Sequence, residues 1–481
     1  MIPLCLSLQG KTLGENIALL KELKGHFDLA EIRADYLQED QREELASFPA
    51  RLDVPAILSC RRAREGGGCT SDEPTRLSLL EEGLKGSYAY LDLESDCLDT
   101  GLEEQGRAKG TRIIRSFYCR GKIPPELPAL MKDRADRGEI PRVVMGLETS
   151  REQEELLTLS RRLEGIDEYL LLGEGAFGSP ARILAGKLGA AFTYCTAAVT
   201  ADREDEFPVE VMDELYRVRE IDRETAVFGI IGNPVMHSKS PAIHNPGFSV
   251  IGMKAVYLPF PTDDPEAFFR LSRELDIRGF SVTMPFKNAV LPFLHEMTEG
   301  VAAVKSCNTV VRRGDRWWGC NTDVEGFLFS LDSWFPRGLS SVKTAVLGAG
   351  GAAGAIVYGL VSRGADVTVY NRTTEKALQC AEKYGCSWGS LRDFHREGDY
   401  PLIIQATGVG MHPHEESDPA PDYRFSGREA VVDIIYYPEE TRFLRRAREA
   451  GCRTMNGLAM LKAQGVLQFR LFTGREYPPD L

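Results

Sequence analysis

The chain has 481 residues, a length that exceeds one ordinary hydrophobic core and predicts two or more domains. Its hydrophobic content of 43% and charged content of 27% are those of a globular protein, and its formal charge of -13 argues against a nucleic-acid partner. Because the sequence has no signal-like start and no run of about eighteen uncharged apolar residues, we expect a cytoplasmic protein without membrane contact. Its 11 cysteines form no C-x-x-C pair, so we expect no metal site.

The first half of the chain alternates short apolar runs with charged segments that look helical. The runs are PLCLSL, FDLAEIR, AILSC, YAYLDLE, TRIIRSFY, PRVVMG, EYLLLG and AAFTYC. Eight strands of this kind in about 220 residues predict a (β/α)8 barrel, which we assign to residues 1–222.

A change of pattern marks the start of a second half. PVEVMDELYRVREID at 208–222 has helical spacing, and AVFGIIGNP then begins like a new strand, which places the join near 221–227. Two further α/β blocks follow, so we expect a substrate lobe formed by 226–330 and 455–481 and a Rossmann lobe at 331–454. The fold class of the whole chain is therefore α/β, and the cleft between the two lobes is the expected ligand site.

A dinucleotide fingerprint opens the second block. TAVLGAGGAAGAIVYGL predicts a strand, a tight turn and a helix, with Gly348, Gly350 and Ala353 in the G-x-G-x-x-A positions. The next strand, DVTVY, ends in NRT, where an NAD site would carry an acidic residue. The planar cation of Arg372 suits a ribose 2′-phosphate, so we expect NADP(H) as the cofactor. The alternative for Arg372 alone is a solvated surface charge.

Polar motifs follow other predicted strands of the second half. GNPVMHSKSPAIHN places Ser238 and Ser240 where hydroxyls can hold an anionic or hydroxylated ligand, although SP also suits a helix start. SVTMPFK presents Thr283 and Lys287, and GCNTDVEG presents Asp323. Taken singly, each of these residues is more commonly a surface charge or a helix cap.

Taken together, the motifs of residues 228–475 resemble shikimate dehydrogenase. They are GNP..HSKSP..HN, VTMPFK, CNT, GCNTD..G, GAGGAA, NRT, DIIYYPEET and NGLAMLKAQ, in that order. The resemblance implies reduction of 3-dehydroshikimate to shikimate with NADPH, a step towards chorismate and the aromatic amino acids. A lysine held by a carboxylate can deliver the proton that reduction of a ring ketone requires.

The same resemblance implies the site residues. Lys287 and Asp323 would be the catalytic pair, and Ser238 and Ser240 would hold the substrate carboxylate. The substrate hydroxyls would meet Thr283, Asn308, Tyr436 and Gln464. The cofactor would be held by Gly348, Ala349, Gly350, Gly351, Ala352, Asn371, Arg372, Thr373, Thr407 and Gly457. One departure is QATGVGM, which begins with Gln405 where the family more often has asparagine.

The first half resembles type I 3-dehydroquinate dehydratase, the preceding pathway step. EIRADYL supplies Glu31 and Arg33, SCRRAREGG supplies Arg61 and Glu65, and SPARIL supplies Arg182. The resemblance implies that these five residues hold an anionic ligand inside the barrel.

Both catalytic positions of that dehydratase family are substituted. The family forms an imine on a lysine in an IPK or VK context and uses a histidine in S-x-H-D. This sequence has Arg142 in IPR and Tyr118 in SFYC, and AAVTADRED stands in place of the terminal P-G-Q. A guanidinium does not lose its proton at working pH, so Arg142 cannot form an imine. His26, the only histidine before residue 237, is expected at the opposite end of the barrel.

We therefore expect a dehydrogenase that carries a barrel without imine chemistry. The alternatives are a bifunctional enzyme that also accepts 3-dehydroquinate, a barrel with a different chemistry, and a ligand-binding or assembly module that adjusts the dehydrogenase. The sequence leaves open the oligomeric state and whether quinate is a substrate.

Overall fold

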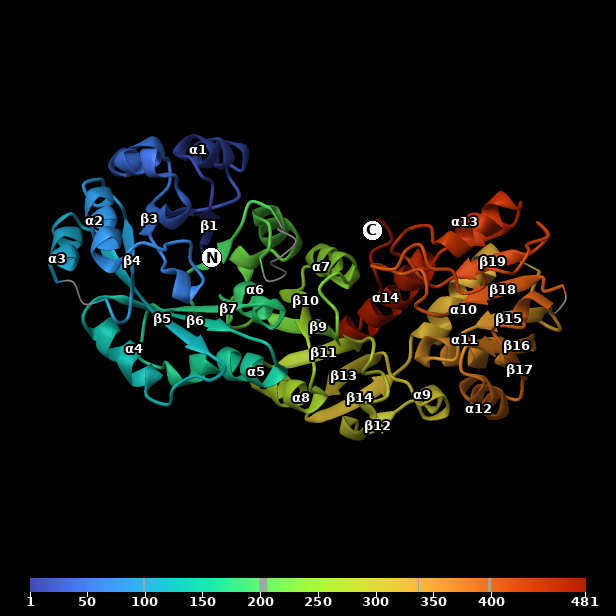
Figure 1. Ribbon diagram of the computed structural model, residues 1–481. Coiled ribbons are helices and arrows are strands. Elements are labelled where there is room, and N and C mark those ends of the chain that lie inside the picture. The colour runs from blue at the N-terminus through green and yellow to red at the C-terminus, as the bar shows by residue number, and fades with distance from the viewer. Residues whose placement is uncertain (98–99, 199–205, 336, 397–398) are drawn as a thin grey trace. The chain divides into compact units, whose positions relative to one another are not determined.

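The computed structural model describes residues 1–97, 100–198, 206–335, 337–396 and 399–481 (Figure 1). It divides into two compact units, Met1–Arg278 and Gly279–Leu481. The expected join near 221–227 lies within the first unit, and the domain limits stay a prediction. Most of AAVTADRED, namely residues 199–205, lies outside the described residues.

Eight parallel strands form the sheet of the first unit, in the order β7-β6-β5-β4-β3-β2-β1-β8 (Figure 1). β1 pairs with both β2 and β8, so the sheet curls into a nearly closed barrel, and the barrel expected from the sequence is confirmed. The strands are β1 (Leu4–Leu8), β2 (Leu29–Arg33), β3 (Ala56–Ser59), β4 (Tyr90–Glu94), β5 (Arg112–Arg120), β6 (Ile140–Gly146), β7 (Leu170–Glu174) and β8 (Thr193–Cys195). The intervening helices are α1 (Leu13–Glu22), α2 (Glu73–Gly83), α3 (Thr100–Ala108), α4 (Leu127–Asp136), α5 (Ser150–Leu159) and α6 (Ser179–Ile183).

The strand alternation places particular side chains inside the barrel. Ile140 and Val144 of β6 belong to the cluster of apolar residues in the barrel interior. Because successive side chains of a strand point to opposite faces, Arg142 shares the inward face with them. Tyr90 belongs to the same cluster, so Asp92 of β4 also points inward.

The segment between the barrel and the next strand differs from its expected structure. The sequence predicted one helical stretch over 208–222, but the structure contains two short turns, Val211–Leu215 and Val218–Glu220. Arg217 separates them with a φ of 50°, a left-handed backbone conformation that interrupts a right-handed helix. The amino-acid sequence gives no sign of this break, because neither glycine nor proline occurs at that position.

In the rest of the first unit, α8 packs on barrel helix α5 and β10 packs on barrel helix α6. This segment contains the parallel strands β9 and β10 and the helices α7 and α8. The Ser150 hydroxyl of α5 accepts from Asp263 N at 2.9 Å, and Arg270 of α8 donates to Glu154 of α5 at 2.9 Å. These contacts join the segment to the barrel. The bounds are β9 (Ala226–Gly232), α7 (Ser240–Val250), β10 (Ala255–Pro261) and α8 (Pro265–Glu274).

The second unit begins with a small antiparallel arrangement. β13 pairs with β11 on one side and β14 on the other, and β12 pairs in parallel with β14. Helix α10 follows β14 and packs against the last helix, α14. The bounds are β11 (Ile277–Val282), β12 (Glu296–Met297), α9 (Glu299–Val304), β13 (Thr309–Arg313), β14 (Arg316–Cys320), α10 (Asp323–Trp334) and α14 (Leu458–Thr473).

A six-stranded parallel sheet in the order β17-β16-β15-β18-β19-β20 completes the second unit (Figure 1). The direction of winding reverses between β15 and β18, and ligands of such sheets bind at this point, beyond the carboxyl ends of the strands. The bounds are β15 (Lys343–Leu347), α11 (Gly351–Ser362), β16 (Asp366–Asn371), α12 (Thr374–Tyr384), β17 (Ser387–Ser390), β18 (Leu402–Gln405), β19 (Ala430–Asp433), α13 (Arg442–Glu449) and β20 (Arg453–Met455). In the described part of the chain, no helix is long and apolar enough to cross a membrane.

Candidate active sites

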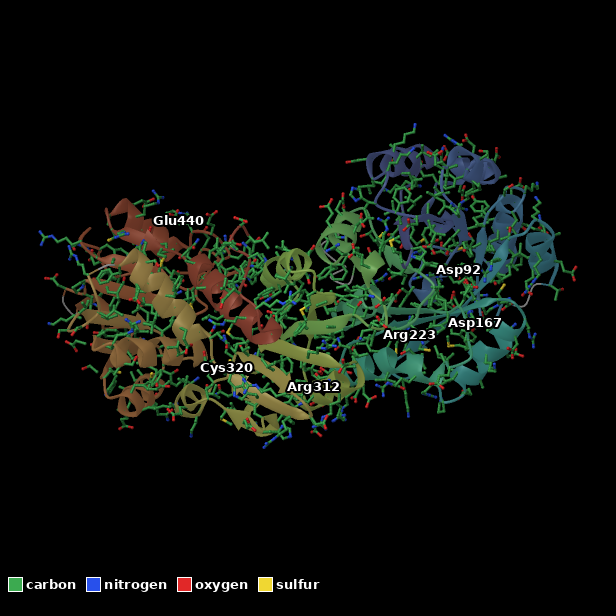
Figure 2. The ribbon with its side chains drawn as sticks, turned by 180° about the vertical axis from the view of Figure 1, so that it is seen from behind. Asp92, Asp167, Arg223, Arg312, Cys320 and Glu440 are labelled. Carbon is green, nitrogen blue, oxygen red and sulfur yellow. The ribbon has the colours of Figure 1, made fainter. Side chains whose placement is uncertain are left out.

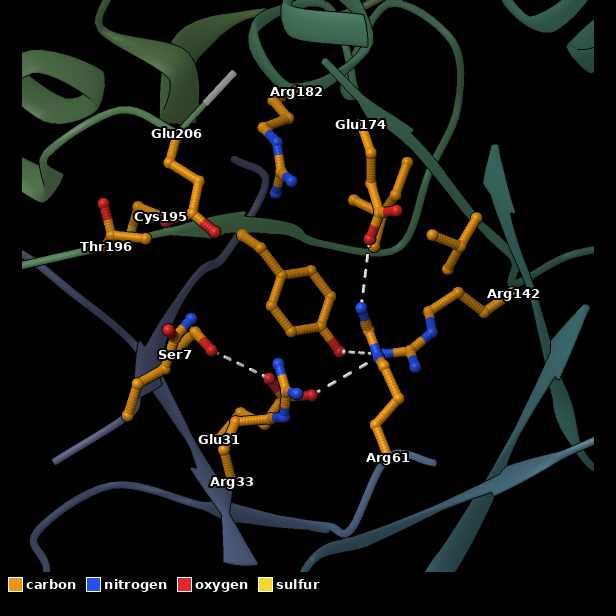
Figure 3. Close-up of a pocket in the computed structure, with 14 residues that line it drawn as sticks. Ser7, Glu31, Arg33, Arg61, Arg142, Glu174, Arg182, Cys195, Thr196 and Glu206 are labelled. Carbon is orange, nitrogen blue, oxygen red and sulfur yellow. Dashed lines mark hydrogen bonds and ion pairs between the residues drawn. The ribbon is translucent and has the colours of Figure 1, made fainter. Parts of the chain in front are cut away.

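Arg142 lies in the barrel interior with a fully buried side chain (Figure 3). Its Nη1 donates to the Tyr194 hydroxyl at 2.9 Å, and its Nη2 donates to the Asp92 carboxylate. The Tyr118 hydroxyl accepts a longer bond from Nη2 at 3.3 Å, and Glu31 Oε1 lies 3.6 Å from Nη1. The guanidinium is therefore held by two carboxylates and two phenols.

Asp92 is the main counter-charge of Arg142 and lies among the barrel strands (Figure 2). It also accepts from Ser116 Oγ at 2.5 Å and from Ser59 Oγ at 3.1 Å. Burial disfavours both charged forms, but their mutual attraction outweighs burial. The pKa of Arg142 is held well above its ordinary value and the pKa of Asp92 below its own, so both stay ionised.

Four of the five barrel residues expected to bind an anion line one cavity (Figure 3). They are Glu31, Arg33, Arg61 and Arg182. The fifth, Glu65, is not among the lining residues and pairs with Arg62 at 3.5 Å.

Two further arginines of this cavity, Arg61 and Arg33, bind carboxylates of the protein itself. Arg61 donates to Glu174 at 3.0 Å, and Arg33 donates to both oxygens of Asp35 at 3.0 and 2.6 Å. A carboxylate ligand of Arg61 or Arg33 would therefore compete with Glu174 and Asp35 for the guanidinium N–H groups.

In the second unit, Lys287 and Asp323 form the ion pair that the sequence suggested. Lys287 follows β11 in the turn that starts at Thr283, and Asp323 is the first residue of α10. Lys287 Nζ donates to Asp323 Oδ2 at 2.6 Å, and their side chains are only 15% and 7% exposed. The lysine is thus held by one carboxylate and keeps limited access to solvent.

Asn308 joins this pair to Gln464. Its Nδ2 donates to Asp323 Oδ1 at 2.8 Å and to Gln464 Oε1 at 3.0 Å. Gly326 of α10 permits this, because a Cβ at that position would lie 2.8 Å from the backbone of Gln464 on α14. The close approach of α10 and α14 brings the start of one helix beside the middle of the other.

Three further expected substrate residues, Ser238, Ser240 and Tyr436, lie on other segments of the chain. Ser240 begins α7 in the first unit, and its hydroxyl accepts from Ser238 Oγ at 3.2 Å. Tyr436 follows β19 in the second unit, and burial raises its pKa. The placement of these three residues beside Lys287 stays a prediction.

The turn after β15 forms a cradle at the start of α11. Gly348 has a φ of 119°, and a Cβ on it would lie 2.8 Å from the carbonyl oxygen of Ala406. Gly350 caps α11 with open space around its Cβ position. The buried Ser306 Oγ has no hydrogen-bond partner among the described residues and lies 3.4 Å from the Cβ position of Gly351. Open backbone at a helix N-terminus beside an unused hydroxyl fits a dinucleotide phosphate.

Arg372 follows β16 and is exposed. Within the part of the chain that the structure describes, it makes no hydrogen bond or ion pair through its side chain. Its neighbour Asn371 donates to Thr373 O at 2.9 Å and so closes the turn into α12. A free guanidinium at this turn fits a ribose 2′-phosphate.

Gln405 replaces the expected asparagine and holds the turn after β18. Its Oε1 accepts from Thr407 N at 2.5 Å, and its Nε2 donates to Val409 O at 3.0 Å. The Gln405 side chain is completely buried, so it shapes the loop that carries Thr407. Gly457, the last expected cofactor residue, caps α14.

Four residues of these two sites were not predicted from the sequence, namely Asp92, Tyr194, Thr322 and Gln468. Asp92 could have been found, because a carboxylate in the apolar run YAYLDLE is as unusual as an arginine in PRVVMG. Thr322 and Gln468 sit in helical or capping positions, where polar residues are ordinary. Their partners become visible only in three dimensions.

A barrel followed by a dinucleotide-binding sheet with a lysine–carboxylate pair defines the class, a barrel-fused NADP-type dehydrogenase. The type I 3-dehydroquinase family matches residues 4–223. The shikimate dehydrogenase substrate binding domain matches residues 230–310, and the shikimate / quinate 5-dehydrogenase family matches residues 332–409. The chain belongs to the shikimate dehydrogenase family and carries a type I 3-dehydroquinase domain ahead of it.

Individual relatives agree with this assignment. The bifunctional 3-dehydroquinate dehydratase/shikimate dehydrogenase of Arabidopsis thaliana, named as chloroplastic, is 30% identical over 94% of this chain and 79% of its own length. The NADP(+) shikimate dehydrogenase of Carboxydothermus hydrogenoformans is 38% identical over 54% of this chain and 95% of its own. A shikimate dehydrogenase crystallised with NADP+ has a TM-score of 0.50 at 32% identity, over 54% of this chain and 93% of its own.

Proposed function

We propose that this protein reduces 3-dehydroshikimate to shikimate with NADPH. The observation that carries the proposal is the Lys287–Asp323 pair at 2.6 Å, in a chain that belongs to the shikimate dehydrogenase family. The substrate lobe would comprise 226–330 and 455–481, and the cofactor lobe 331–454. We keep the cytoplasm as the predicted compartment, to be checked by cell fractionation.

Lys287 acts in this proposal as the proton donor. Bound NADPH supplies the hydride for the ring ketone. As negative charge develops on the ketone oxygen, Lys287 Nζ donates a hydrogen bond and then a proton to it. Asp323 keeps the ammonium in place through Oδ2, and Asn308 fixes the other oxygen of Asp323. Ser238 and Ser240 would bind the substrate carboxylate, and Thr283, Tyr436 and Gln464 its hydroxyls.

Replacing Lys287 tests this role. We expect Lys287→Met to lower kcat by about 10²- to 10⁴-fold, the usual contribution of a positioned proton donor. The measurement is the loss of NADPH absorbance with 3-dehydroshikimate. Lys343→Met, at the exposed start of β15, is the matched control and should keep full activity. A Lys287→Met enzyme with wild-type kcat would remove the proton-donor assignment.

The cofactor preference rests on Arg372. We expect Arg372→Asp to weaken NADPH binding by tenfold or more and to shift the preference towards NADH, because a carboxylate repels the 2′-phosphate. Steady-state kinetics with each nucleotide measure this shift. Arg428→Asp, an equally exposed change just before β19, is the control. Unchanged NADPH affinity in Arg372→Asp would show that another residue meets the phosphate.

For the barrel, we propose the absence of imine chemistry. Arg142 stands where the dehydratase family has its lysine, and the guanidinium stays protonated between Asp92 and Glu31. Imine formation needs a neutral amine, which a guanidinium does not provide. The test supplies 3-dehydroquinate with NADPH and follows NADPH, with 3-dehydroshikimate as the positive control. Formation of 3-dehydroshikimate from 3-dehydroquinate without NADPH, abolished by borohydride trapping of an imine on the barrel, would refute the proposal.

A bifunctional enzyme is the second candidate, because the Arabidopsis relative that spans 94% of this chain is named as bifunctional. The same assay decides between the two. If the barrel instead binds a carboxylate without turning it over, 3-dehydroquinate would raise the thermal stability of the protein and leave NADPH unused.

A further inference from the structure

The hydrogen bonds of the proposed catalytic pair continue through Asn308 and Gln464 to a buried residue. Gln468 lies on α14 one helical turn after Gln464, and its side chain is only 1% exposed. Its Oε1 accepts from Ser281 Oγ at 2.9 Å. Its Nε2 donates to Thr309 Oγ1 at 2.9 Å and to Gln464 Oε1 at 3.3 Å. A buried amide is thereby fixed from both ends.

The orientation of the neighbouring Asn308 amide is dictated by a backbone group. The Thr322 N–H, which can only donate, points at one end of the amide at 2.7 Å, so that end is Oδ1. The other end is then Nδ2, which donates to Asp323 Oδ1 and Gln464 Oε1. Each hydrogen bond of this network therefore has a defined donor and acceptor, and Asn308 donates to both Asp323 and Gln464.

The orientation of Gln468 follows from the same logic. Thr309 Oγ1 gives its single hydrogen to Asn308 Oδ1 at 2.9 Å, so towards Gln468 it accepts. The carbonyl oxygen of Asn308, at 3.4 Å, can also only accept. The atom of Gln468 that faces these acceptors is therefore Nε2.

Gln464 Oε1 accordingly receives two donors, Asn308 Nδ2 and Gln468 Nε2. Its own Nε2 makes no hydrogen bond within the described part of the chain, and Gln464 is half-buried rather than enclosed. Flipping this amide would place its N–H groups against two donors and lose both bonds.

We propose that Gln468 is a positioning residue that keeps the Gln464 amide turned so that it presents N–H groups to the substrate. Gln464 then recognises a substrate oxygen that accepts a hydrogen bond, and Gln468 acts only through it. This inference rests on the proposed dehydrogenase function.

Gln468→Glu is the sharpest test, because it keeps the shape and removes the donor when the carboxylate is ionised. The ionised oxygen would face Gln464 Oε1 and turn that amide over. We expect the KM for 3-dehydroshikimate to rise about tenfold or more at high pH, the equivalent of one lost hydrogen bond of about 1.4 kcal/mol, with a smaller change in kcat.

The pH profile distinguishes positioning from simple destabilisation. At low pH a protonated glutamic acid regains an O–H donor towards Gln464, so the KM of Gln468→Glu should return towards the wild-type value as pH falls. Gln379→Glu, on the exposed face of α12, is the matched control and should follow the wild-type profile throughout. A Gln468→Glu KM that matches wild type at every pH would overturn the inference.

A double-mutant cycle checks that Gln468 acts through Gln464. In a Gln464→Met background the added Gln468→Glu change should leave the KM unaltered, whereas additive effects would overturn the inference. If Gln468→Glu fails to fold, Gln468→Met provides the same cycle without a buried charge. Failure of the proposed function would look different, because wild type itself would not oxidise NADPH with 3-dehydroshikimate.

Discussion

Arg142 shows how one residue can change the chemistry of a site while the charged residues around it are kept. A lysine at this place would need to shed its proton to act, whereas the guanidinium is kept charged by Asp92 and held by two phenols. At residue 142 the barrel interior therefore contributes to an ionic cluster rather than offering an amine nucleophile.

Removing the charge of Arg142 should lower the free energy of unfolding of the first unit. We expect Arg142→Met to destabilise the first unit by about 3–5 kcal/mol, because Asp92 would be left as an unpaired buried carboxylate. Urea-induced unfolding measures the loss. Arg112→Met on β5 is the control, since its partner pair with Glu168 is exposed and should contribute at most about 1 kcal/mol. Equal unfolding midpoints for the two variants would contradict this view of the cluster.

Asp433 offers a pH test at the end of β19. Burial raises the pKa of this carboxyl to about 7, although Ile435 N and the Thr441 hydroxyl donate to it. Its ordinary pKa is about 3.9, so between about pH 4 and pH 7 the folded state holds a proton that the unfolded state has lost. The Asp433 contribution to stability is then full below about pH 4 and falls as pH rises to about 7.

Asp433→Asn should remove this pH dependence. We expect the Tm of the variant to exceed that of wild type increasingly as pH rises from about 4 to 7. Differential scanning fluorimetry across this range measures it. A Tm difference that stays constant with pH would show that Asp433 does not titrate there.

At the scale of elements, the sequence predicted the barrel and the dinucleotide-binding sheet because their signals are local. Strands buried on both faces read as continuous apolar runs, and the turn after β15 needs glycine at residue 348, where φ is 119°. The break at Arg217 was not predicted, because no residue type in the sequence there favours a left-handed conformation. The contact between α5 and α8 could not be predicted from the sequence either, because more than one hundred residues separate the partners.

The contact between α5 and α8 can be tested at Ser150. Its hydroxyl accepts from Asp263 N at 2.9 Å and from Asp264 N at 3.3 Å, and its own N–H donates to Asp263 Oδ1 at 2.8 Å. We expect Ser150→Ala to cost about 1–2 kcal/mol in unfolding free energy, since Asp263 N loses its acceptor.

The matched control is Ser160→Ala, at the other end of the same helical region. The Ser160 hydroxyl makes no hydrogen bond to the residues that the structure describes. Guanidinium titrations of both variants should separate their midpoints. Equal midpoints would mean that the Ser150 contact is replaced by water.

At the scale of the molecule, the compact division at residues 278 and 279 differs from the join that sequence motifs suggested. Sequence motifs mark where residues with a shared chemical role begin, which places the join near 221–227. The compact division depends instead on contacts between elements, such as those of α5 with α8. Sequence reasoning located Lys287, Asp323, Asn308 and Gln464 through their motifs. It could not supply the hydrogen-bond directions behind them, which depend on how α10 approaches α14.

The two units should respond separately to the cofactor. All expected cofactor residues lie between Gly348 and Gly457, inside the second unit. We expect NADP+ at about 100 times its Kd to stabilise that unit by about 2.7 kcal/mol and leave the unfolding of the first unit unchanged. Calorimetry measures the transitions, and Arg142→Met identifies the one that belongs to the first unit. A cofactor-induced shift in the transition marked by Arg142→Met would contradict this expectation.

The arginine of β6 also bears on inhibitor selectivity. Reagents that capture the lysine of an imine-forming dehydratase would meet no primary amine among the described residues that line this cavity. In a mixture of the two barrel types, such a reagent should add mass to the lysine-bearing enzyme and leave this chain at its native mass. A compound built on amine capture would thus find no target in this cavity, and inhibitors of this protein are better aimed at Lys287 and the cofactor cradle.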